Sequence, residues 1–195
     1  MALFKNTQQQ INTGSRQALQ AKYNSARMNI MWVVVFTAIN IIMLSAGSDS
    51  SFLFSAAVPT YLISFSMFYC GMYPTEWYEG VPPFDFVDKS LFWGALAVSV
   101  IVVAFYLLCF ILAKKRAGWL ISALVFFALD TALLLLVFGI SIDMIADYIF
   151  HAWIIVIFSM GISAHNKLKS LPPEEYEVQA ENIADVNNND NGEQY

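Results

Sequence analysis

Charged residues are scarce in this chain: 13% of its 195 residues are Asp, Glu, Lys or Arg, whereas 58% are hydrophobic. A soluble domain carries about 25% charged residues, which cover its water-facing surface. The mean hydropathy of +0.56 points in the same direction. This composition excludes a single globular domain in water and indicates an integral membrane protein.

Several chemical signatures are also missing. There are only two cysteines, Cys70 and Cys109, and both lie in apolar runs, so no disulfide framework is expected. No clustered Lys/Arg face of the kind that binds phosphate backbones is present, which argues against nucleic acid as a partner. The chain also lacks an HExxH motif and a glycine-rich phosphate loop. We therefore expect no cofactor and disfavour an enzyme.

What the chain does contain is a series of apolar segments. Five of them approach or reach the roughly 20 residues that a membrane-crossing helix needs: 28–46, 52–72, 90–113, 117–140 and 142–164. Backbone groups in hydrocarbon must be hydrogen-bonded within their own segment, so each should be helical. The sequence predicts an all-α membrane protein, a small bundle of four or five membrane helices within residues 28–165.

Both ends of the chain are polar but differ in charge. Residues 1–27 have four basic residues and no acid, and are expected to form a cytoplasmic arm or an interfacial helix. This lead is too long for the usual basic start of a signal peptide, so cleavage is not expected. Residues 166–195 contain seven acids and are predicted to form a disordered acidic tail.

The basic residues also bear on topology, because Lys and Arg near span ends normally remain in the cytoplasm. If all five segments crossed, five basic residues would lie on each side of the membrane. If residues 28–72 cross only once in net, nine lie on one side and Lys89 alone on the other. We therefore expect both termini in the cytoplasm and the loop 73–89 outside.

The segment 52–72 is the one expected to fail to cross. Pro59 lies near its middle, where proline removes a backbone donor and disfavours helix at the preceding residue. A re-entrant or interfacial hairpin would accommodate that break. A kinked but complete span is the alternative, and the sequence leaves both open.

Asp130 is the residue that the apolar pattern does not explain. It lies near the centre of its segment, where an aspartate costs roughly 2.5–3.5 kcal/mol on insertion scales and so needs a partner. Asp143, Asp147 and His151 follow at intervals of four and share one helix face. A hairpin folded near residues 140–141 places His151 level with Asp130, which predicts a hydrogen bond between them.

Three interpretations of this intramembrane polar cluster remain open. It could be a structural clasp between two helices, with the acid satisfied by the imidazole. It could handle protons or cations, for which Asp/His chains are typical. A metal or hydrolytic site is the third, although the other histidine, His165, lies about 21 Å further along the same helix.

Two stretches carry a resemblance: KKRAGWLISALVFFALDTALLL and FHAWIIVIFSMGISAHNKLKSLPPEE. Together they resemble small uncharacterised integral membrane proteins of Gram-positive bacteria, a family with no known activity. The resemblance implies a location in the bacterial cell membrane. The function expected is that of an accessory or interaction component, with the lipid bilayer and a protein bound by the arm or the tail as partners. A small transporter or proton-coupled component using the Asp/His cluster is the alternative, and the oligomeric state stays open.

Overall fold

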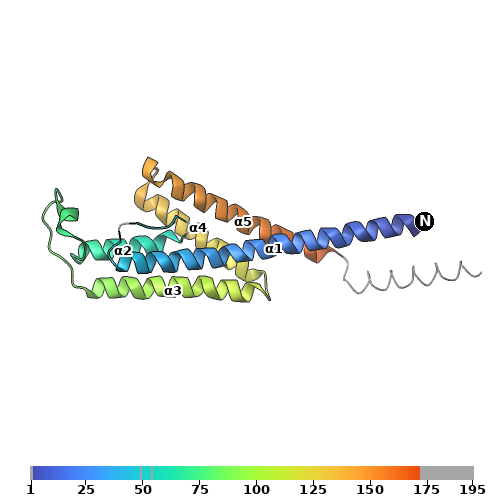
Figure 1. Ribbon diagram of the computed structural model, residues 1–195, viewed down its shortest axis with the longest axis horizontal. Coiled ribbons are helices and arrows are strands. Elements are labelled where there is room, and N and C mark those ends of the chain that lie inside the picture. The colour runs from blue at the N-terminus through green and yellow to red at the C-terminus, as the bar shows by residue number, and fades with distance from the viewer. Residues whose placement is uncertain (1, 49, 54, 172–195) are drawn as a thin grey trace, which may run out of the picture. The chain divides into compact units, whose positions relative to one another are not determined.

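The computed structural model describes residues 2–48, 50–53 and 55–171 of the chain (Figure 1). All regular structure in these residues is helical, which confirms the predicted all-α class. The helices are α1 (Ala2–Ser45), α2 (Ala57–Tyr69), α3 (Ser90–Ala113), α4 (Gly118–Phe138) and α5 (Ile145–Ser170). Two short 3-10 helices, η1 (Thr75–Tyr78) and η2 (Ile142–Met144), lie in the loop before α3 and directly before α5.

Four stretches are long and apolar enough to cross a membrane: Ser15–Ser45, Ser90–Ala113, Gly118–Phe138 and Ile142–Ser170. The remaining helix, α2, has 13 residues. At 1.5 Å per residue it extends for about 20 Å, which is less than the hydrocarbon core of about 30 Å.

The boundaries differ from those expected in two places. Helix α1 already begins at Ala2, so the arm 1–27 and the first predicted span form one continuous helix. Helix α5 continues to Ser170, five residues into the stretch assigned to the tail. Lys167 and Lys169 lie in its last turn, where cations interact favourably with the helix dipole. The rest of the predicted disordered tail, residues 172–195, lies outside the described residues.

The chain divides into two compact units. One consists of the chain up to Ser25 together with the chain from Met160 onwards, and the other is Ala26–Ser159. Within the first unit, the rings of Tyr23 and His165 lie with their centroids 5.1 Å apart. The second unit holds the polar cluster.

Within the second unit, α2 packs against α1 and α3. Its buried Ile63 and Met67 share one apolar core with Leu44 of α1 and with Phe92 and Ala95 of α3. After α1 the chain turns back, and α2 begins part-way along α1 (Figure 1). This geometry agrees with the re-entrant interpretation of segment 52–72 and not with a kinked span.

Candidate functional site

Asp130 of α4 lies at the start of α2 rather than only beside α5. Its Oδ2 accepts a hydrogen bond from the N–H of Ala57 at 2.8 Å, and its Oδ1 accepts one from the N–H of Val58 at 2.8 Å. These are the first two residues of α2, whose N-cap, Ala56, has no side-chain acceptor of its own. A buried carboxylate from a distant helix therefore caps α2, where the helix dipole also favours negative charge.

The other backbone donors at this helix start are also accounted for. An isolated helix leaves its first four N–H groups without partners. At α2 the N–H of Ala56 donates to Thr37 Oγ1 at 2.8 Å, and Pro59 has no N–H to satisfy. The proline that breaks the span thus fits the first turn of α2, where the missing donor has no cost.

The chain leading into α2 is held by Asn40 of α1. Its Nδ2 donates to the carbonyl of Phe52 and to Ser55 Oγ, both at 2.8 Å. Its Oδ1 accepts the N–H of Phe52 at 2.7 Å. Asn40 is fully buried, so its amide replaces the water that this non-helical backbone would otherwise need.

Two positions show how deep this cluster lies. Thr37 lies eight residues before the end of α1, and Asp130 lies eight residues before the end of α4. Each is therefore about 12 Å from the end of its helix. The start of α2 meets both, so it lies within the bundle and not at the surface.

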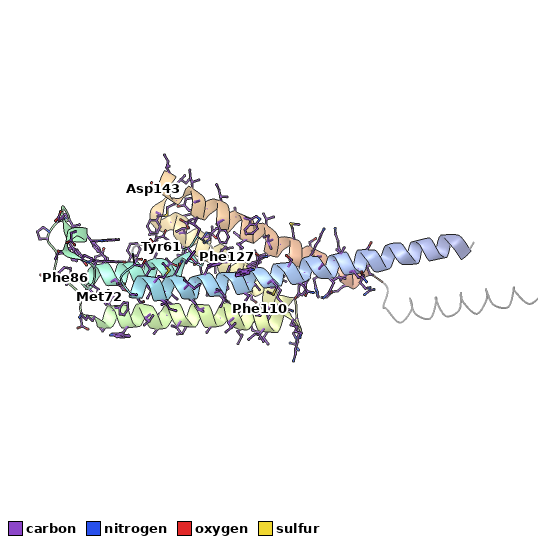
Figure 2. All side chains as sticks on the ribbon, in the orientation of Figure 1. Tyr61, Met72, Phe86, Phe110, Phe127 and Asp143 are labelled. Atoms are coloured by element: carbon purple, nitrogen blue, oxygen red, sulfur yellow. The ribbon has the colours of Figure 1, made fainter. Side chains whose placement is uncertain are left out.

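His151 of α5 completes the cluster. Its Nε2 lies 3.2 Å from Asp130 Oδ2, which is the pairing expected from the helical hairpin, and its Nδ1 lies 2.8 Å from the backbone carbonyl oxygen of Asp147. The ring stacks on Phe127, with centroids 4.8 Å apart. Figure 2 labels Phe127. His151 is 1% exposed and Asp130 5%, so both groups are screened from lipid.

The hydrogen-bond pattern indicates which atoms of the pair donate. We assign Nδ1 a proton because it faces a carbonyl oxygen, which can only accept. Nε2 and Asp130 Oδ2 must then share a second proton, since two bare acceptors would repel each other. The carboxyl group of Asp130 therefore meets three partners, namely the two N–H groups of α2 and the imidazole ring.

The structure brings together two of the four residues predicted for the site. Asp130 and His151 are in contact, whereas Asp147 contributes its backbone carbonyl and its carboxylate is only half-buried. Asp143 is exposed in η2 near the α4–α5 turn (Figure 2). The predicted single helix face ends before Asp143 because the regular helix begins at Ile145. Whether the four act as one site stays a prediction.

Sequence reasoning missed the main partner of Asp130, the backbone of α2. Backbone N–H groups have no residue-type signal, and Ala57 is 73 positions away from Asp130 in the chain. The sequence does contain one indirect signal. The N-cap residue of α2 is Ala56, whose side chain cannot accept a hydrogen bond, so the N–H groups of the first turn need an acceptor from another part of the chain.

Tyr106 of α3 borders the cluster without taking part in it. Its side chain is 1% exposed, and its hydroxyl has no hydrogen-bond partner among the residues that the structure describes. Its ring lies against Phe127, with centroids 6.4 Å apart. This hydroxyl is a buried donor beside the cluster that the described contacts leave unused.

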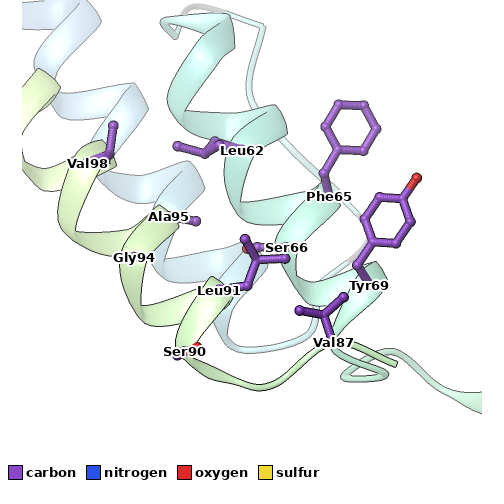
Figure 3. Close-up of a pocket in the computed structure, with 10 residues that line it drawn as sticks. All are labelled: Leu62, Phe65, Ser66, Tyr69, Val87, Ser90, Leu91, Gly94, Ala95 and Val98. Carbon is purple, nitrogen blue, oxygen red and sulfur yellow. The ribbon is translucent and has the colours of Figure 1, made fainter. Parts of the chain in front are cut away.

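A groove on the outside of the unit lies apart from the cluster. It has a volume of about 620 Å³ and runs between α2 and α3 (Figure 3). Leu62, Phe65 and Tyr69 form one wall, and Leu91, Ala95 and Val98 form the other. Its walls are largely apolar, with Ser66 and Ser90 as the serines among the lining residues.

Outside the membrane segments, Asp88 caps α3. Its Oδ1 accepts the N–H of Ser90, the first residue of the helix, at 2.8 Å. This backbone hydrogen bond lowers the pKa of Asp88 below its ordinary value of 3.8. The carboxylate is fully exposed, so its effect is local to the start of α3.

Among the residues described here, no group of three or more His, Cys, Asp or Glu side chains is arranged to hold a metal ion. Comparison of the chain with protein-family models, with curated proteins and with solved structures returned no match. The class that the fold defines is a helical membrane protein with four helices of spanning type.

Proposed function

We propose that this protein is a non-enzymatic accessory or interaction component of the bacterial cell membrane, in which the Asp130–His151 pair is a structural clasp. The observation that carries the proposal is the cap on α2. Asp130 binds two backbone N–H groups and His151, and so joins α2, α4 and α5 at one point. Removing one partner of a buried pair is strongly destabilising, so we assign the carboxyl group of Asp130 a structural role.

The orientation follows from the distribution of charge. With four crossings, nine of the ten basic residues lie on one side and Lys89 lies on the other. We place the nine in the cytoplasm together with both termini. The bacterial cell membrane is the location that the resemblance noted in the sequence implies.

Two oppositely charged segments are the proposed partner-binding regions. The basic arm 1–27 and the acidic tail 166–195 lie on the same side of the membrane in this topology. Lipid surrounds the bundle, and a protein partner binds one of the two segments. Nucleic acid is not a partner in this proposal.

Ion flux in vesicles tests the clasp. Wild-type protein and the Asp130→Asn variant are reconstituted into vesicles that contain a pH-sensitive dye, and a pH gradient is imposed. A structural clasp predicts equal decay of the gradient for both proteins and for protein-free vesicles. Decay that is specific to the wild type and absent from a folded Asp130→Asn variant contradicts it.

One observation favours a second candidate, a small transporter or proton-coupled component. A half-length helix begins inside the bundle and directs its N-terminus at a buried carboxyl group, an arrangement typical of discontinuous helices at transport sites. The hydroxyl of Tyr106, which has no partner among the residues that the structure describes, adds a further hydrogen-bonding group nearby. The same vesicle assay with Tyr106→Phe tests this candidate, since a proton path through that hydroxyl requires a slower flux in the variant.

A further inference from the structure

Arg27 of α1 is a cation with no carboxylate partner among the residues that the structure describes. Its guanidinium carbon lies 5.2 Å from the centroid of the Phe110 ring of α3, which is cation–π geometry. Its Nε is buried and has no hydrogen-bond partner in the described part of the chain. The ring lies against the guanidinium and accepts no hydrogen bond from Nε, so this donor is open to a further partner.

Three more cations lie on the turn that follows. Lys114, Lys115 and Arg116 connect α3 to α4, and all three are exposed. Lys114 is four residues after Phe110, so it lies one turn further along nearly the same helix face. Figure 2 shows Phe110 at this end of α3. Only Lys114, Lys115 and Arg116 are consecutive in the sequence. The fold brings Arg27 close to them, so the cluster contains four basic residues.

No carboxylate on the neighbouring helices neutralises this cluster. Residues 1–48 and 89–129 contain neither Asp nor Glu. The first acid along α4 is Asp130, about 18 Å from the start of that helix, and it is already engaged with α2 and His151. The four cations thus form a positive patch that no acid of α1, α3 or α4 offsets.

Apolar side chains continue from this patch along the outside of the bundle. Leu108 and Ile111 of α3 and Ile121 of α4 are each about half exposed. A ligand with a negative head and hydrocarbon chains matches this pairing of surfaces. Basic pockets between helices at a membrane surface bind anionic lipid headgroups in this way.

We propose that Arg27 and the turn 114–116 bind the phosphate of an anionic phospholipid headgroup. The guanidinium donates to the phosphate oxygens while Phe110 holds it in place, and the three residues of the turn supply further charge. The acyl chains lie along the exposed Leu108, Ile111 and Ile121. This site is separate from the polar cluster and does not depend on its role.

The test uses the full chain in detergent, titrated with phosphatidylglycerol or with phosphatidylcholine of the same acyl chains. Bound lipid is counted by native mass spectrometry. We expect selective retention of phosphatidylglycerol by the wild type and affinity about fivefold weaker in Arg27→Gln. Lys89→Gln, which removes the cation at the opposite end of α3, is the matched control and should bind like the wild type.

A second variant keeps the test independent of folding. Lys114, Lys115 and Arg116 are exposed, so their joint replacement by Gln should leave the thermal transition unchanged while weakening lipid binding more than Arg27→Gln does. Equal retention of the two lipids, or equal weakening by Lys89→Gln, overturns the proposal. Inorganic phosphate is the third arm. If it displaces phosphatidylglycerol at equal concentration, the ligand is free phosphate and the lipid assignment is wrong.

Discussion

The Oδ1 atom of Asp130 accepts a hydrogen bond from the backbone N–H of Val58 at 2.8 Å, which ties the middle of α4 to the first turn of α2. Most helix caps come from the residue just before the helix. This cap comes from a residue 72 positions later in the chain. The start of α2 therefore depends on a residue of α4, which lies outside the segment 52–72.

Two substitutions at Asp130 should separate the effect of losing both hydrogen-bond acceptors from the effect of losing one. Asp130→Leu leaves two buried N–H groups and His151 Nε2 without their partner, and we expect a loss of about 3–5 kcal/mol in the free energy of unfolding. Asp130→Asn keeps one acceptor and should cost about 1–3 kcal/mol. Denaturation in detergent, followed by circular dichroism, measures both. Asp143→Asn is the matched control, since that carboxylate is exposed; equal losses for Asp143→Asn and Asp130→Leu would refute the cap.

His151 should couple energetically to Asp130. His151→Phe removes the Nε2 donor, whereas His151→Gln retains a donor at the same reach and should be milder. In a double-mutant cycle, Asp130→Asn combined with His151→Phe should show a coupling energy of about 1–3 kcal/mol, because the two side chains share one hydrogen bond. Thermal unfolding of the four proteins provides the measurement. Strict additivity would show that the pair contributes nothing as a pair.

Cysteine labelling should show that α2 returns to the side from which it entered. In a background without Cys70 and Cys109, cysteines placed at Ser48 and Glu79 should both react with an impermeant maleimide added outside whole cells. A cysteine at Lys115 should react only after the membrane is opened. The loops on either side of α2 share one surface in this fold, so labelling of positions 48 and 79 from opposite sides would require segment 52–72 to cross.

Acid should loosen the start of α3 through Asp88. The pKa of this carboxyl is lowered in the folded protein by the N–H of Ser90, so its stabilising effect is complete above its ordinary value of 3.8 and is lost as the pH falls through the lower folded value. Hydrogen exchange of the Ser90 and Leu91 amides should accelerate in that window. Asp88→Asn should remove the pH dependence, whereas Glu79→Asn should leave it unchanged. An unaltered acid response in Asp88→Asn would assign the effect to another group.

The sequence was sufficient for the spanning helices because their signal is local. Residues 90–113 coincide with α3 as the structure defines it, since apolar length alone determines such a helix. The level of His151 was also predictable, because two antiparallel helices joined by a short turn keep a fixed rise per residue. Both results need only the order of residues along one hairpin.

The start of α2 could not be derived in the same way. It requires acceptors from Thr37 and Asp130, which lie on two helices that are distant in the chain, and its donors are backbone groups common to every residue type. The local structure at Asp143 was also not predicted. The spacing 143, 147 and 151 assumed one continuous helix, whereas residues 142–144 form η2 directly before α5.

The borrowed cap on α2 also constrains the order of assembly. A ribosome delivers residues 57–69 to the membrane before Asp130 has been synthesised, so the helix start initially lacks its acceptor. Until α4 enters the bilayer, those N–H groups must be sheltered by water or by the insertion machinery. Folding of this protein is therefore completed late in biogenesis, because α2 gains its final hydrogen bonds only after α4 has been inserted.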